Sequence, residues 1–145
     1  MTECQHCHFE SPRPCSFLEL ELSIADTDSL QDALRSFQAR EELSGSNQYA
    51  CNQCQCKRDA LRYTRLENLP PVLNIQLLRF VFDLKTLSKK KLKKKVRFPL
   101  TLDMSEFVHN GPRKEGFVYD LKAVLLHRGS SADSGHYVSR IRDEK

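Results

Sequence analysis

Apolar and polar side chains alternate along Phe17–Ile24, where leucine or isoleucine occupies every second position and glutamate or serine lies between them. Such alternation is typical of a β-strand with one buried face. The period then lengthens to three or four residues. This pattern predicts a helix that begins after the N-cap cluster Asp26–Asp28, runs to about Glu42 and is stopped by Ser44 and Gly45. Its apolar face would carry Leu30, Ala33, Leu34 and Phe37.

The second half of the chain predicts antiparallel strands. Val72–Phe82 is apolar on both faces and indicates a central strand. Polar Asp83–Lys95 would form a hairpin tip, with Val96–Phe98 as the return strand. Further strands are expected at Ala60–Leu66, Phe117–Leu126 and His136–Ile141, and irregular chain at 1–16, Tyr49–Lys57 and His127–Gly135. The expected fold class is α+β, mainly antiparallel β, with one clear helix.

The length of 145 residues suggests one domain, and the net charge of +4 is unevenly distributed. Lys89–Arg97 holds seven cations, which leaves the rest of the chain at −3. This excludes a uniformly basic nucleic-acid-binding domain. The lysine run favours a solvated hairpin tip, with a nuclear-import signal as the next interpretation and the border of a substrate channel as a third.

The chain contains no apolar run long enough for a membrane helix, and Met1–Glu10 lacks the apolar core of a signal peptide. We therefore expect a cytoplasmic or nuclear protein with no membrane partner. Thiols stay reduced in those compartments. The six cysteines are accordingly interpreted as metal ligands, nucleophiles or small buried side chains before disulfides.

Two C-x2-C units carry the strongest chemical signal: Cys4 with Cys7, and Cys51 with Cys54. Two intervening residues let one tight turn direct both thiolates at one ion, and two such turns complete the tetrahedral site of structural zinc. The 43 residues between the units exceed the usual zinc-ribbon spacing, but the predicted strand and helix would fill the interval. Two alternatives remain open. The cysteines could be surface and core residues whose spacing is a coincidence, or a C-x2-C unit could be a redox pair. The nearby residues that could serve as spare ligands are His6, His8 and Cys56.

Ser134–Val138 places His136 at the start of a predicted strand, directly after Gly135. A histidine in that position can reach into a cleft while the strand fixes its ring, as a general base requires. A packed or solvated histidine is the alternative. His127 is a weaker candidate for a base, and His109 is expected to be exposed. The sequence offers no convincing nucleophile, because Cys15 and Cys56 do not lie at a predicted helix N-terminus.

Several segments together resemble the catalytic domain of the ubiquitin-specific proteases, over its C-terminal two-thirds. They are Leu69–Asp83, Tyr119–Gly129, Ser134–Val138 and the paired C-x2-C units. The resemblance implies a papain-like hand with thumb, palm and fingers. It also implies hydrolysis of the isopeptide bond after the C-terminal glycine of ubiquitin, so ubiquitin and ubiquitinated proteins are the expected partners.

The resemblance also assigns roles to individual residues. It makes His136 the catalytic base, places Gly135 and Tyr137 against the substrate, and makes Cys4, Cys7, Cys51 and Cys54 the zinc ligands. It divides the chain into a fingers region with the zinc knuckles and the helix (1–68) and a palm with the histidine motif (69–145).

No segment resembles the family's N-terminal box with the nucleophilic cysteine, and the residue that would orient His136 is expected beyond Lys145. We therefore expect a catalytic domain that lacks its thumb and is inactive alone. Two other functions stay open. One is a non-catalytic ubiquitin-binding module. The other, ranked last, is a zinc-ribbon nucleic-acid binder that uses the lysine run.

Overall fold

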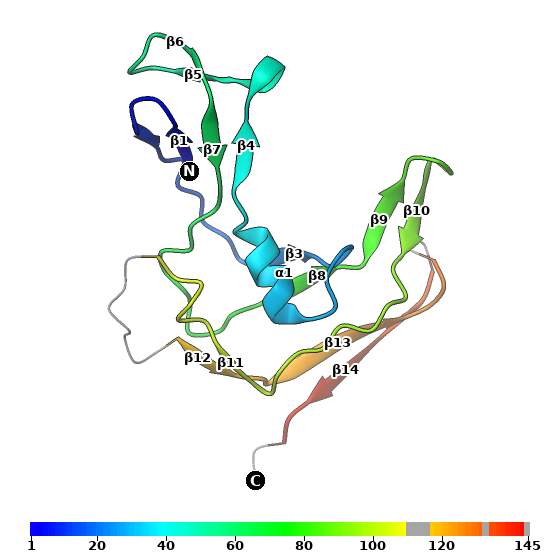
Figure 1. Cartoon of the computed structure of the whole chain (residues 1–145). Helices are drawn as coiled ribbons and strands as arrows, with labels where there is room; N and C mark the ends of the chain where they lie inside the picture. The colour runs from blue at the N-terminus through cyan, green and yellow to red at the C-terminus, as the bar shows by residue number, and fades with distance from the viewer. Residues whose placement is uncertain (110–116, 132–133, 144–145) are drawn as a thin grey trace.

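The structure, a computed structural model, describes residues 1–109, 117–131 and 134–143. An arm built from the N-terminal strands and the middle of the chain rises from a body that contains the single described helix, α1 (Leu30–Phe37). A second, smaller projection is the hairpin of β9 (Phe80–Asp83) and β10 (Ser88–Lys91) (Figure 1). No helix in the described ranges is long and apolar enough to cross a membrane.

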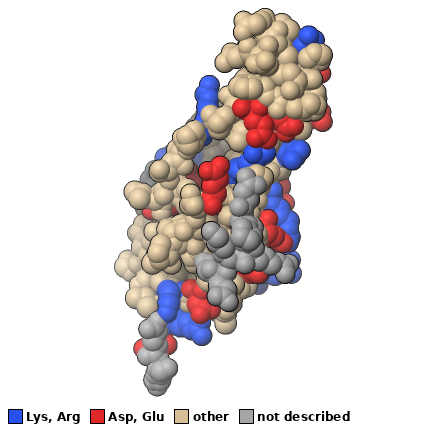
Figure 2. Space-filling model, turned by 90° about the vertical axis from the view of Figure 1, so that its left-hand side faces the viewer, with Lys and Arg blue, Asp and Glu red and all other residues tan. Residues whose placement is uncertain are grey.

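The arm is built on a four-stranded antiparallel sheet in the order β2-β1-β7-β4. A separate hairpin, β5 with β6, lies at its tip. The strands are β1 (Thr2–Cys4), β2 (Glu10–Ser11), β4 (Glu41–Leu43), β5 (Tyr49–Cys51), β6 (Cys56–Arg58) and β7 (Ala60–Arg62), with a 3-10 turn at Gly45–Asn47. Figure 2 shows acidic and basic side chains meeting in a band beneath the largely uncharged tip of the arm.

The main core lies in the body, where β3 (Leu20–Ser23) pairs in parallel with β8 (Ile75–Leu78) and α1 packs against β3. The alternation predicted along Phe17–Ile24 is confirmed for Leu20, Leu22 and Ile24, which are all buried. The strand begins only at Leu20, however, and Leu18, expected on the same buried face, is 92% exposed. Residues far along the chain complete this core. They are Leu66, Leu102, Met104 and Phe107. The helix therefore packs with residues beyond position 68 and away from the cysteine units, although the sequence grouped it with them.

Two further antiparallel pairs form the lower part of the body in Figure 1. β11 (Thr101–Asp103) pairs with β12 (Val118–Asp120), and β13 (Ala123–Arg128) pairs with β14 (His136–Ile141). The long β13–β14 pair contributes no buried side chain to the main core. One face of it carries the exposed apolar residues Leu125, Tyr137 and Ile141.

The helix differs from its predicted boundaries at both ends. Its N-cap is Ser29, whose side chain accepts a hydrogen bond from the Asp32 amide, and the Asp26–Asp28 cluster lies outside the helix. Asp28 is engaged elsewhere, because its carbonyl accepts from the Arg97 amide and its carboxylate lies 3.0 Å from Lys94 Nζ. The helix ends at Phe37, because the chain leaves it to form β4, which the sequence pattern did not predict.

Several predicted strands are also corrected. Val72–Phe82 is not one strand: β8 begins at Ile75, and β9 follows it after Arg79. The Arg79 guanidinium donates to the carbonyl oxygens of Leu92 and Lys94. The return strand of the hairpin is β10, not Val96–Phe98. Tyr49–Lys57, expected to be irregular, contains β5 and most of β6, and the supposedly irregular N-terminus contains β1 and β2. The strand expected at Ala60–Leu66 is only β7.

Candidate functional site

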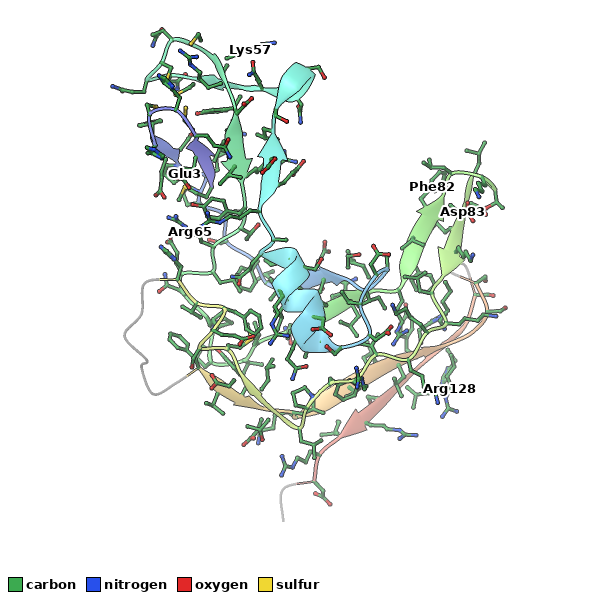
Figure 3. All side chains as sticks on the ribbon, viewed as in Figure 1. Glu3, Lys57, Arg65, Phe82, Asp83 and Arg128 are labelled. Carbon is green, nitrogen blue, oxygen red and sulfur yellow. The ribbon has the colours of Figure 1, made fainter. Side chains whose placement is uncertain are left out.

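Four cysteines converge at the tip of the arm. Cys4 ends β1 and Cys51 ends β5, and both are buried; Cys7 and Cys54 lie in the turns that follow. The four sulfur atoms all lie within 4.8 Å of one another. Cys4 Sγ is 3.9 Å from Cys54 Sγ, and Cys7 Sγ is 3.6 Å from Cys51 Sγ. Figure 3 shows sulfur atoms at the upper end of the arm, beyond Glu3.

The two C-x2-C units fold in the same way. His8 follows Cys7 and Gln55 follows Cys54, and these residues have φ angles of +57° and +56°. This left-handed backbone turns the chain sharply after each second cysteine. The His8 amide donates to the Cys4 carbonyl at 2.9 Å, and the Cys54 amide donates to Cys51 Sγ at 3.5 Å. The turns thereby direct each pair of thiols toward the other pair.

The thiols fit a divalent, sulfur-preferring ion. Thiolates about 2.3 Å from a tetrahedral zinc ion lie about 3.8 Å from one another. The distances of 3.6 and 3.9 Å in the cluster match that separation. No disulfide links any of the four residues. The arrangement could therefore hold one metal ion with four cysteine ligands, the set expected from the sequence.

The acidity of the thiols also changes within the cluster. Burial opposes ionisation of Cys4, but hydrogen bonds from the Cys7 and His6 amides and from neighbouring thiols outweigh it and lower the pKa of Cys4 to about 7. Burial and the other three thiols raise the pKa of Cys54 to about 12. Without a cation, ionisation of one thiol thus opposes ionisation of the next. A bound divalent ion reverses this, because it stabilises thiolates directly.

The other predicted ligands and nucleophiles lie outside this cluster. Cys15 is exposed, and its thiol lies 3.5 Å from the Ser16 carbonyl oxygen. Cys56 is exposed in β6, opposite Cys51. His8 lies 3.7 Å from Glu3. The structure therefore brings together the four C-x2-C cysteines without these spare residues.

His136 is the first residue of β14, opposite Arg128 of β13, and its side chain is exposed. Gly135 precedes His136 in the sequence and lies close against the side chain of His127. A Cβ atom at Gly135 would overlap His127 Nε2 and lie 2.6 Å from the Arg128 carbonyl oxygen. Tyr137 follows it on the other face of the strand, with its ring centroid 5.0 Å from that of His127. The predicted histidine motif thus lies at one end of β13–β14, far from the cysteine cluster (Figure 1).

Comparison with known proteins gives the family. The sequence matches the family described as "Ubiquitin carboxyl-terminal hydrolase" over residues 3–145. The chain belongs to the ubiquitin carboxyl-terminal hydrolase family. The resemblance to deubiquitinating proteases that the sequence motifs predicted is therefore confirmed.

Relatives within the family include ubiquitin carboxyl-terminal hydrolase 48, the member to which Phe17–Ser23, Leu78–Asp83 and His127–Gly129 also pointed. The zebrafish (Danio rerio) protein of that name is 46% identical over 143 residues, which is 99% of this chain and 14% of the relative. Ubiquitin carboxyl-terminal hydrolase 26 of Arabidopsis thaliana is 40% identical over 148 residues, 100% of this chain and 14% of that relative. The chain thus spans about a seventh of the length of these relatives.

A solved structure supports the fold assignment. The SAGA Ubp8/Sgf11/Sus1/Sgf73 DUB module bound to ubiquitin aldehyde contains a chain that is 29% identical to this one, with a TM-score of 0.82. The match covers 98% of this chain and 32% of that chain. The predicted fold class, a mainly antiparallel palm with cysteine-bearing fingers, is confirmed.

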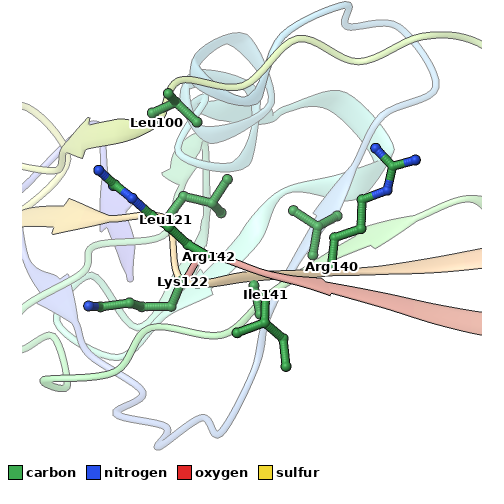
Figure 4. A pocket seen from close by; sticks show the side chains of 8 residues that line it. Leu100, Leu121, Lys122, Arg140, Ile141 and Arg142 are labelled. Carbon is green, nitrogen blue, oxygen red and sulfur yellow. The ribbon is translucent and has the colours of Figure 1, made fainter. Parts of the chain in front are cut away.

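The pocket in Figure 4 is separate from both groups of predicted residues in this hydrolase-family chain. It is an open hollow of about 390 Å³ at the end of β13–β14 opposite to His136. Three cationic side chains and several aliphatic ones line it: Leu100, Leu121, Lys122, Ala123, Val124, Arg140, Ile141 and Arg142. Its lining contains no thiol, histidine or carboxylate.

The sequence patterns missed one feature of the histidine region. Lys91, which the sequence treats as one member of the lysine run, contacts His127 and Gly129. Lys94 is also engaged, with Asp28 and the Ala25 carbonyl oxygen, whereas Lys89, Lys90, Lys93 and Lys95 are exposed. A run of lysines does not show from its sequence which lysine side chain is bound by other parts of the protein.

Proposed function

We propose that this chain supplies three parts of a deubiquitinating cysteine protease: the zinc-bound fingers, the ubiquitin-facing palm and the general base His136. The observation that carries the proposal is the exposed imidazole of His136 at the start of β14. The chain in which it lies matches the hydrolase family over residues 3–145. A relative of this fold was solved with ubiquitin aldehyde, which supports ubiquitin as the partner. Ubiquitinated proteins are then the substrates.

His136 would work as a proton carrier in this role. Its neutral imidazole accepts the proton of a cysteine thiol, and the thiolate attacks the carbonyl carbon of the last glycine of ubiquitin. The imidazolium then donates that proton to the departing lysine amine. In the second half of the reaction, His136 accepts a proton from the water that attacks the thioester carbon. The carbon–sulfur bond then breaks, ubiquitin leaves with a free carboxylate, and the imidazolium returns the proton to the departing thiolate. Gly135 and Tyr137 would border the bound ubiquitin tail.

We propose that these 145 residues alone do not hydrolyse ubiquitin conjugates. Four of the six cysteines converge at the tip of the arm, and Cys56 lies in that arm as well. Cys15 is exposed, and its thiol donates to the Ser16 carbonyl oxygen. No thiol thus contacts His136 in the described structure, and the nucleophile would come from another segment.

The test combines binding and turnover. Titration of the isotope-labelled chain with ubiquitin should give saturable shifts in NMR spectra, and a ubiquitin–fluorophore substrate should not be cleaved. Turnover that survives Cys15→Ala with Cys56→Ala would contradict this account of the site. The absence of both binding and turnover would contradict the ubiquitin assignment itself. In the product of the complete transcript, His136→Gln should abolish cleavage and spare ubiquitin binding.

We also propose that the cysteine cluster holds one structural zinc ion. The four-sulfur ligand set and its sulfur–sulfur distances support zinc over oxygen-preferring ions such as magnesium or calcium. We propose the cytoplasm or the nucleus as the location of the chain, because thiols such as these free cysteines stay reduced there. Expression of a tagged chain, followed by cell fractionation, tests the location.

A non-catalytic ubiquitin-binding module is the second candidate. The lack of a thiol contact at His136 favours it, because binding needs the palm and fingers but no nucleophile. The transcript decides between the two candidates. A message that encodes a cysteine-containing segment upstream supports the protease, and one that encodes only these residues supports the binding module. Nucleic-acid binding is not proposed, because two lysines of the basic run are held within the protein.

A further inference from the structure

Lys91 is bound at three points, unlike its neighbours in β10. Its Nζ lies 3.0 Å from His127 Nδ1, 2.8 Å from the His127 carbonyl oxygen and 2.8 Å from the Gly129 carbonyl oxygen. An ammonium group has three donors, so all of them are used. The contacts join the base of the β9–β10 hairpin to the end of β13. Lys90, the adjacent residue, is exposed and has no polar partner among the described residues.

The same contacts determine which nitrogen of His127 carries the proton. An ammonium group only donates, so Nδ1 must accept and the single ring proton lies on Nε2. The ring is also held from its sides. Its centroid is 5.3 Å from that of Phe80, edge to face, and 5.0 Å from that of Tyr137. Lys91 thus fixes both the tautomer and the orientation of His127.

The His127 ring fits into space that is open because Gly129 and Gly135 have no Cβ atom. A Cβ atom at Gly129 would lie 3.0 Å from His127 Cε1 and 2.6 Å from the Ser134 carbonyl oxygen. A Cβ atom at Gly135 would overlap the same ring at Nε2. The ring therefore packs between the point where the chain leaves β13 and the point where it enters β14.

His136 follows Gly135 directly but lies on the opposite face of the strand pair. His127 pairs with Tyr137, whereas His136 pairs with Arg128. Successive residues of a strand point to opposite faces. His127 therefore acts on His136 through its two neighbours in the chain, because the His127 ring lies against Gly135 on one side of it and against Tyr137 on the other. Figure 3 shows Arg128 of β13 on the same side of the molecule as the β9–β10 hairpin, which carries Phe82 and Asp83. Lys91 connects this hairpin to β13.

We propose that Lys91 and His127 are positioning residues for His136. Lys91 orients the His127 ring, and the ring sets the backbone at the entry to β14 from which His136 projects. This inference rests on the proposed function, because His136 is a general base only there. It assigns a specific task to one partly buried lysine of a run that otherwise includes four exposed lysines.

The test compares Lys91→Met with Lys90→Met in the full chain labelled at histidine. Both variants lose one charge from β10, but only the first loses the contacts to β13. Long-range proton–nitrogen correlation spectra report which ring nitrogen is protonated. The unmodified chain should show His127 as the single Nε2–H tautomer. Lys91→Met should lose that pattern and shift the ring signals of His136, whereas Lys90→Met should change neither.

A second variant, His127→Asn, separates the ring from the lysine contact. Asparagine keeps a polar acceptor near the position of Nδ1 but removes the ring that touches Gly135. It should shift the His136 signals as Lys91→Met does. If either variant lowers the melting temperature but leaves the ring and amide signals of His136 in place, the contact is a structural tie and the proposal is wrong.

Failure of the proposed function would be seen separately. The tautomer and the His136 signals are measured without ubiquitin, so they do not depend on binding or cleavage. Shifted His136 signals in a chain that binds no ubiquitin would support the positioning geometry and contradict the proposed function. Ubiquitin binding with unmoved His136 signals would overturn the positioning role alone.

Discussion

Ser29 determines where α1 begins. Its hydroxyl accepts from the Asp32 amide at 3.1 Å and donates to the Asp32 carboxylate at 2.6 Å. Loss of an N-cap hydroxyl costs about 1 kcal/mol. We therefore expect Ser29→Ala to lower the free energy of unfolding by about that amount, measured by urea denaturation. Ser36→Ala, at an exposed position within the same helix, is the control and should have little effect.

The same variant should alter the pH dependence of stability. The Ser29 hydrogen bond lowers the pKa of Asp32, with Arg35 adding to the effect. A carboxyl group whose pKa is lowered by folding stabilises the protein above its unfolded pKa, and this contribution is lost as the pH falls. The difference between Ser29→Ala and the unmodified chain should therefore shrink in acid. An equal difference at neutral and acidic pH would contradict the assigned hydrogen bond.

Arg65 should have a comparable effect on Glu10 at the base of the arm. Two guanidinium nitrogens lie 2.7 and 3.1 Å from the Glu10 carboxylate, and this hydrogen bonding lowers the pKa of Glu10. Arg65→Met should raise that pKa, read from the carboxyl carbon signal during an NMR titration. It should also destabilise the chain at neutral pH and less so in acid. Arg62→Met removes only the exposed pair with Glu41 and should change stability little.

At the scale of elements, the arm should depend on metal while the body does not. The core around α1 contains none of the four cluster cysteines. Structural zinc sites contribute about 10–16 kcal/mol of apparent binding free energy. Metal stripping, or Cys51→Ser, should thus unfold β1, β2 and β4–β7 and leave the α1 core folded. Amide hydrogen exchange measures the two regions separately.

Cys56→Ser is the matched control for the zinc prediction. It removes a thiol from the same hairpin, but the Cys56 thiol lies outside the cluster. Metal analysis should find one zinc ion per chain for this variant and none for Cys51→Ser. Unchanged protection of the arm after complete metal removal would show that the cluster is not a structural zinc site.

Sequence patterns predicted the features of these elements that depend on neighbouring residues. They did not predict which distant strands pair with one another. The C-x2-C spacing identifies Cys4, Cys7, Cys51 and Cys54 because each pair is shaped by its own turn. The parallel pairing of β3 with β8 joins residues such as Leu22 and Leu77, and no local period encodes such a partner. The predicted start of the helix was wrong for the same reason. Asp28 binds Arg97 and Lys94, which are distant in sequence, and does not cap the helix.

The candidate site divides in the same way. His136 is recognisable from its motif, because Gly135 and the strand that follows lie next to it in sequence. The contact between Lys91 and His127 joins β10 to β13 across a sequence that repeats the same residue type. Its selection among six lysines depends on the register of β10 against β9, which places Lys91 opposite Phe80.

At the scale of the whole molecule, β13–β14 presents an uncovered apolar face. Leu125, Tyr137 and Ile141 are 69%, 61% and 76% exposed. The strand register places all three on one face, together with His127. Exposed contiguous apolar surface favours association. We expect the isolated chain to bind an apolar fluorescent dye and to self-associate as its concentration rises.

Removal of that surface should reverse both properties. Leu125→Ser with Ile141→Ser should lower dye fluorescence and shift sedimentation velocity profiles toward the monomer, with little change in melting temperature because both side chains are already exposed. Leu84→Ser is the control, because Leu84 is 80% exposed but follows β9 in the hairpin, away from this face. If Leu84→Ser reduces association as much as the double variant does, the apolar face of β13–β14 is not the surface responsible. An effect confined to the double variant would identify this face as the surface through which the chain associates.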